Sequence, residues 1–255
     1  MIKIMQGELY RVRKNHLFFA CLLLSVFFIF ALSLTFNYNT IRLPIQAGNS
    51  VVVSITRFTE FFFSDYSLII PLTVFLIFYF TEDYQKGIHG ILLSKGILRR
   101  DFFFGKLIAS WFITLFYLVF NFLIAYVFIF FMCAKQPYIE CSFTHISGYL
   151  VLQILCFIGY SSFLWLLSCL LPFPGIALII CFVLLITLYL YLNKISAALD
   201  LSYSLYHYWI VGLSHGMSID FYVKQLSVII PTILGYILLS VFLAFLIYRK
   251  KDLRR

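Results

Sequence analysis

The feature that most constrains this chain is a long stretch without charged residues, from Cys141 to Asn193. None of its 53 residues is Asp, Glu, Lys or Arg, and most are apolar. Because an apolar segment of about 20 residues can cross a bilayer as a helix, this stretch suits two crossings. The segment LPFPG at 171–175 holds two prolines and a glycine, which interrupt helices, and it predicts the boundary between the two.

The composition of the whole chain agrees with a membrane location. Of its 255 residues, 63% are hydrophobic and only 11% are charged. The run from Leu17 to Phe36 is long enough to span and no small-residue cleavage site follows it, so we interpret it as a first span. We expect an all-α polytopic membrane protein with one transmembrane domain over residues 1–255. The six predicted spans are about 17–36, 61–81, 107–133, 148–170, 174–192 and 226–248.

The basic residues give the expected orientation. Of 19 Lys and Arg residues, 14 lie in the N-terminal segment, in the segment 82–106 and in the tail RKKDLRR. With six spans these three segments share one side of the membrane. The positive-inside rule then places both termini and the 82–106 segment in the cytoplasm. The net charge of +9 is explained by this placement, so we expect no nucleic-acid partner.

The segment 82–106, EDYQKGIHGILLSKGILRRDFFFGK, is the longest charged stretch between apolar runs. Ile88, Ile91 and Leu92 follow the spacing of one helical face. Basic residues and three phenylalanines then precede the next span. The pattern predicts a short helix, about 84–96, lying flat under the membrane. By itself such a helix also fits a lipid anchor that binds anionic head groups.

The order of residues here resembles the permease subunits of ABC-2 type ABC transporters. In those permeases a cytoplasmic segment between the second and third spans carries a Glu, a Gly, a Leu-rich stretch, a small-residue turn, an Arg and a Lys. The matching residues are Glu82, Gly87, Ile91-Leu92-Leu93-Ser94, Gly96, Arg99 and Lys106. The N-terminal segment GELYRVRKNHLFF looks like the amphipathic helix that leads into their first span, here about 5–16. One departure is that Ile88 and His89 stand where the family commonly has Thr after the Gly.

The resemblance implies that the 84–96 helix is a coupling helix, which docks onto a separate ATPase subunit. The residues it assigns to docking are Glu82, Gly87, Ile91, Leu92, Gly96 and Arg99, with Glu8 and Arg11 in the N-terminal helix. The chain has no G-x-x-x-x-G-K-[ST] motif, so ATP would be hydrolysed by the partner, and we expect no catalytic residue, cofactor or metal in this chain. The implied partners are an ABC ATPase dimer, a second permease subunit that is identical or paralogous, and membrane lipid. Small six-span permeases of lantibiotic immunity and bacitracin resistance imply export of, or immunity to, an amphipathic antimicrobial peptide at the bacterial plasma membrane.

A second hypothesis is a protein of another functional class, a non-transporting membrane scaffold or sensor that binds anionic lipid through its basic cytoplasmic face.

Other polar residues have simpler interpretations. Asn121 and Gln153, inside predicted spans, are expected to form interhelical hydrogen bonds. The outer loop 193–225 is rich in aromatics, and we expect it to lie on the outer leaflet rather than to form an outer gate. Cys133 and Cys141 flank one short loop, and a disulfide between them is an open alternative.

Overall fold

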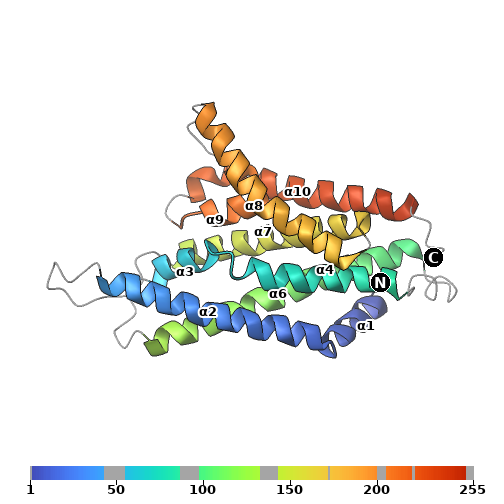
Figure 1. Ribbon diagram of the computed structural model, residues 1–255, viewed down its shortest axis with the longest axis horizontal. Helices are drawn as coiled ribbons and strands as arrows, with labels where there is room; N and C mark the ends of the chain where they lie inside the picture. Colours follow the sequence, from blue (N-terminus) through green and yellow to red (C-terminus); the bar gives the residue numbers. More distant parts are fainter. Residues whose placement is uncertain are drawn as a thin grey trace.

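The computed structural model describes residues 2–42, 55–86, 98–132, 143–171, 173–199, 205–219 and 222–250, and every regular element within them is helical (Figure 1). The elements are α1 (Ile2–Arg13), α2 (His16–Arg42), α3 (Ile55–Phe63), α4 (Ile69–Gln85), α6 (Arg99–Met132), α7 (Phe143–Leu170), α8 (Pro174–Ala198), the 3₁₀ helix η2 (Leu205–Tyr208), α9 (Ile210–Gly216) and α10 (Tyr222–Lys250).

Five of these helices, α2, α6, α7, α8 and α10, are long and apolar enough to cross a membrane by their length and composition. Each overlaps one of the predicted spans over most of its length. The break between α7 and α8 falls at the predicted LPFPG segment, and α8 begins with Pro174 at its first position, where a missing N–H costs nothing. The predictions of an all-α fold and of a membrane-embedded protein are confirmed at this level.

The predicted span 61–81 differs from the observed helices. The chain forms α3, then a break at 64–68, and then α4, which is 17 residues long. Within the break the Asp65 carboxylate accepts a hydrogen bond from the Ser67 N–H at 2.8 Å, an Asx-type turn that competes with helix. Pro71 consequently lies in the first turn of α4, where its missing N–H has no helical partner to lose.

Helix α4 lies at the centre of the bundle and contacts α2, α6, α7 and α8. Most of its side chains are buried, including Leu72, Phe75, Ile77 and Phe80, and Phe78 is the large hydrophobic side chain that is exposed. Burial on most of its faces explains why the helix is largely apolar until its last turn. The last turn carries Glu82 and Asp83, so the centre of the bundle ends in acidic groups.

The two ends of the bundle differ. Figure 1 shows α1 and the C-terminal end of α10 at one end, and α3 and α9 at the other. Near that other end α8 diverges from its neighbours in Figure 1, and many of its apolar side chains are exposed. The end that carries α1 is called the α1 end below, and the opposite end is called the α9 end.

The loop expected on the outer leaflet is partly buried in the described part of 193–225. Trp209, Ile210 and Val211 are buried, and α9 contacts α7, α10 and η2. Part of 205–219 therefore packs within the bundle, and its position relative to the outer leaflet stays a prediction. Aromatic side chains suit a membrane interface and a packed interior equally well, and here the apolar faces of α7 and α10 provide the interior.

Candidate functional site

The charge cluster at the α1 end is the strongest candidate site. The turn at Lys14–Asn15 folds α1 back toward the bundle, and the Asn15 side chain caps α2 by accepting the Leu17 N–H at 2.9 Å. Helix α1 then packs on α6. The cluster comprises Glu8 and Arg11 from α1, Tyr79, Glu82 and Asp83 from α4, Lys86 beyond α4, and Lys106 from α6.

Asp83 lies at the centre of this cluster. One carboxylate oxygen accepts a hydrogen bond from Arg11 Nη1 at 2.5 Å, and the other accepts one from the Lys106 ammonium. The side chains of Asp83 and Lys106 are both 0% exposed. An isolated buried charge is very costly, so this ion pair is stable only because each charge is matched by another. Asp83 thereby joins α1, α4 and α6 at one point.

A more exposed set of contacts surrounds this pair. Arg11 also reaches Glu82, with Nη2 to Oε2 at 3.3 Å, and Glu8, with Nη1 to Oε1 at 3.6 Å. Lys86 donates to the other Glu82 oxygen at 2.5 Å. The Tyr79 hydroxyl donates to Glu8 at 2.9 Å. Every carboxylate in the cluster is therefore held by at least one donor from another position.

Aromatic rings complete the surroundings of the cations. The Lys106 ammonium lies 4.8 Å from the centroid of the Tyr79 ring and 5.8 Å from that of the Trp165 ring. The Arg11 guanidinium lies 5.6 Å from the Tyr79 ring. These distances are within the range of cation–π attraction. Trp165 is contributed by α7, so the cluster contacts four helices.

The pKa shifts of two groups outside the predicted spans, Asp83 and Arg11, show that attraction between charges outweighs the cost of burial in this cluster. Burial acts to raise the pKa of Asp83, but the charges of Lys106 and Arg11 outweigh it and hold that pKa below its ordinary value. Burial acts to lower the pKa of Arg11, while Asp83 and Glu8 raise it above its ordinary value. Both groups are charged at neutral pH.

The structure brings three of the predicted site residues together: Glu8, Arg11 and Glu82. Arg99 is the first residue of α6 and is exposed. The other four predicted docking residues, Gly87, Ile91, Leu92 and Gly96, lie outside the described residues. So do most of the predicted 84–96 helix and both Cys133 and Cys141. The four described cysteines, Cys21, Cys156, Cys169 and Cys181, are buried.

Sequence reasoning did not assign Asp83, Lys106 or Tyr79 to the site. A signal for the first two was available, because an acid ends one apolar run and a lysine begins the next. Ionisable groups adjoining the bilayer usually pair with one another. The expectation for Asn121 and Gln153 is confirmed: Asn121 accepts from Ser25 of α2 at 2.7 Å, and Gln153 exchanges two hydrogen bonds with Ser214 of α9 at 2.6 and 2.9 Å.

The contacts of the charge cluster join helices to one another. Each of its carboxylates accepts a hydrogen bond from a cation or from a tyrosine hydroxyl. Across the described ranges no group of three or more His, Cys, Asp or Glu residues could hold a metal ion. What the arrangement can do is make α1, α4 and α6 move together.

No protein-family model and no curated protein matches this sequence. The fold and the site define the protein only by class: it is an all-helical, membrane-embedded protein with a charge cluster around a buried ion pair at one end.

Proposed function

We propose that this chain is the permease subunit of an ATP-driven ABC-2 type exporter. The observation that carries the proposal is the charge cluster. It ties the N-terminal helix, the end of α4 and the start of α6, which are the segments that the sequence resemblance assigns to the coupling region. In this proposal α3 and α4 together make the second of six spans, and both termini are cytoplasmic.

The proposed mechanism uses the chain between α4 and α6 as a coupling helix. An ATPase subunit would hold that segment, whose flanking residues Glu82 and Arg99 belong to α4 and α6. Closure of two ATPase subunits on ATP would displace it. Because the charge cluster fixes α1 to both helices, the displacement would move the three as one body, a rigid-body switch between two packings.

The proposed cargo is an amphipathic peptide, and the chain would either export it or confer immunity to it. This part of the proposal rests on the resemblance to small peptide-export permeases. It is supported by polar groups between the helices away from the charge cluster, such as the uncharged hydroxyls and amide of Ser25, Thr73 and Asn121. A second permease subunit, identical or paralogous, would complete the path.

A second candidate function is favoured by one specific observation. A cleft of about 330 Å³ at the α1 end is lined by Arg11, Lys14, Asn15, His16, Glu82 and Lys86. Three basic residues around one cleft suit an anionic lipid head group. A scaffold or sensor that binds anionic lipid through this face would need no ATPase.

The test is affinity purification of the tagged chain in mild detergent, followed by identification and quantification of co-purifying proteins. The proposal predicts a stoichiometric ATPase with the parent chain, which is lost with Arg99→Glu. The matched control is Arg249→Glu, an equal charge change at another exposed residue of the α1 end, which should keep the ATPase. If the folded parent chain purifies without any ATPase, the transporter proposal is refuted. Retention of anionic vesicles under the same conditions would then support the lipid-binding candidate.

A further inference from the structure

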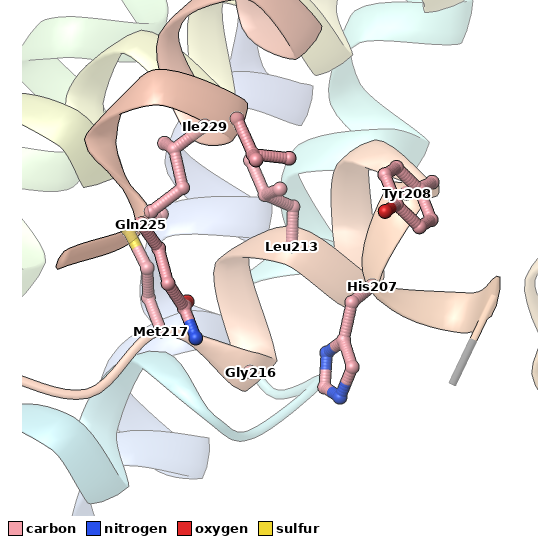
Figure 2. Close-up of a pocket in the computed structure, with 8 residues that line it drawn as sticks. His207, Tyr208, Leu213, Gly216, Met217, Gln225 and Ile229 are labelled. Atoms are coloured by element: carbon pink, nitrogen blue, oxygen red, sulfur yellow. The ribbon is translucent and has the colours of Figure 1, made fainter. Parts of the chain in front are cut away.

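A pocket at the α9 end is separate from the charge cluster and has a lining of its own. It has a volume of about 420 Å³. Figure 2 shows its lining residues coming from three elements. They are His207 and Tyr208 of η2, Leu213 and Gly216 of α9 with the following Met217, and Gln225, Val228 and Ile229 of α10.

The lining divides into an apolar floor and a polar rim. Leu213, Met217 and Ile229 are buried and form the floor. His207 and Gln225 are exposed and present an imidazole and an amide at the rim. Tyr208, also exposed, adds a hydroxyl. The rim groups can all take part in hydrogen bonds, whereas the floor offers only apolar contact.

Gly216 leaves room for the His207 imidazole at the rim. A Cβ atom at this position would lie 2.1 Å from Nδ1 of His207, so any other residue here would require the imidazole to move. The absence of a side chain lets the imidazole lie directly against α9. The shape of the rim therefore depends on glycine at this position.

The walls of the pocket are held by polar contacts that are buried or partly buried. Gln153 of α7 fixes α9 through its two hydrogen bonds with Ser214. The Glu60 carboxylate of α3 accepts hydrogen bonds from the Ser218 hydroxyl at 2.8 Å and from the Ile219 N–H at 2.5 Å. A binding pocket that is held in shape before its ligand arrives avoids the cost of ordering.

The polar and apolar parts of the pocket are arranged in the same order as the head-group and acyl-chain regions of a bilayer. The apolar span within α10 begins at Gln225, and Val228 and Ile229 lie about one turn further into it. Val228 is 46% exposed on the outer surface of the helix. The rim thus lies at the end of the span and the floor lies deeper along it. An amphiphile in the adjoining leaflet would have its polar head and its apolar body in this same order.

Size and charge narrow the ligand class. A cavity of about 150 Å³ accommodates benzene, so this pocket has room for a body roughly three times that size. It also falls in the range of small-molecule sites, about 300–1,000 Å³. Among the lining residues that the structure describes, none is Lys, Arg, Asp or Glu. A ligand with a permanent charge would find no countercharge on these side chains and would lose hydration on entering.

We propose that this pocket binds an uncharged amphiphile from the membrane. Its apolar body would contact Leu213, Met217 and Ile229, and its hydroxyl or amide head would bond to His207, Gln225 and Tyr208. The inference does not depend on the exporter proposal, because the pocket shares no residue with the charge cluster.

The test uses a monoacylglycerol with a photoactivatable diazirine in its acyl chain, added to the purified chain in phosphatidylcholine vesicles. After irradiation, mass spectrometry of peptides locates the adducts. We expect the adducts to concentrate in 205–219 and 222–229. Unlabelled monoolein should reduce the number of adducts at least fivefold. At the same concentration oleate, its anionic counterpart, should reduce it less than twofold.

Two matched variants make the site assignment specific. Val228→Trp places an indole in the pocket and should reduce labelling at least fivefold. Val223→Trp is the same change on the same helix, at a residue that is 47% exposed and does not line the pocket, and it should leave labelling unchanged. Gln225→Leu, which removes a rim amide without adding bulk, should weaken competition by monoolein.

Three results would overturn the proposal. Labelling spread evenly along the exposed apolar faces of α8 and α10 would mean ordinary lipid contact. Labelling that survives Val228→Trp, together with unchanged competition by monoolein in Gln225→Leu, would place the amphiphile elsewhere. If oleate competes as well as monoolein or better, the pocket does not prefer an uncharged head group.

Discussion

Replacing Asp83 with asparagine removes the centre of the charge cluster while keeping the shape of the side chain. In the parent chain Asp83 holds both Arg11 and Lys106. Arg11 retains Glu8 and Glu82 when Asp83 is neutralised. Lys106 is different: the only carboxylate it pairs with in the described structure is Asp83, and it is 0% exposed. The variant therefore leaves one buried ammonium without its countercharge.

The magnitude follows from this geometry. Removing one partner of a buried ion pair typically costs about 3–5 kcal/mol. Asparagine still offers one oxygen to Lys106, so we expect a loss of about 3 kcal/mol in the free energy of unfolding.

The assay is reversible unfolding in mixed micelles, with helix content followed by circular dichroism, and Lys106→Met is the companion variant. In that variant Asp83 keeps Arg11 at 2.5 Å, so the expected loss is smaller, about 1.5–3 kcal/mol for a hydrogen bond to a charged group. The double variant removes both buried charges. It should be more stable than the sum of the single losses predicts, by at least about 1 kcal/mol.

Two outcomes would refute this reasoning. If Asp83→Asn unfolds at the same free energy as the parent chain, the buried pair does not hold α4 to α6. If the double variant loses the sum of the two single losses, Asp83 and Lys106 do not interact. The pH dependence supplies a further check. Because the pKa of Asp83 is lowered in the fold, its contribution is complete above its ordinary value of 3.8 and should be lost only as the pH falls below it.

Three further predictions concern other residues. Arg11→Gln should destabilise the chain by about 1–3 kcal/mol in the same unfolding assay, because the buried Asp83 carboxylate loses one of its two cationic donors and keeps only Lys106. Arg13→Gln on the exposed face of α1 should have no measurable effect, and equal effects of the two variants would contradict the assigned contacts. Burial lowers the pKa of His215 to about 4, so the folded state should lose stability as the pH falls from 6.5 to 4. The variant His215→Gln should abolish that pH dependence. An unchanged pH profile in the variant would show that another group is responsible. Gly212→Ala should lower the melting temperature or prevent folding, because its Cβ would lie 2.0 Å from a carbonyl oxygen of η2. In the control Gly235→Ala, in α10, the added Cβ meets nothing within 4 Å, so the change should be neutral or stabilising by at most about 1 kcal/mol. Comparable losses in both variants would argue against the position of α9.

The long helices were predictable because the absence of charge over about 20 residues leaves few alternatives to a membrane helix. α7 and α8 show this most clearly, since proline and glycine also mark their boundary. The division of 61–81 into α3 and α4 was not predictable in the same way. A single hydrogen bond from Ser67 to Asp65 helps to end the helical pattern there, and an apolar run of residues does not reveal which of its polar members will form such a turn.

The candidate site was predictable in part. Charges that flank spans at one end of a bundle are close together whatever the detailed packing, and Glu8, Arg11 and Glu82 accordingly meet. Asp83 was missed because it is one position from Glu82, and one position turns a helix by about 100°. Only the packing of α6 against α4 decides which of the two acids faces inward. The burial of 205–219 likewise depends on the space between α7 and α10, which no local pattern specifies.

The measurement that tests the central claim most directly is the stoichiometry of the complex that the tagged chain forms in mild detergent. Native mass spectrometry of the purified material gives both the composition and the copy number. The account predicts two ATPase subunits with two permease subunits, and separation of the ATPase when Arg99 is reversed in charge. A folded chain that is recovered with bound anionic lipid and no ATPase, under conditions where the charge cluster is intact, would contradict it.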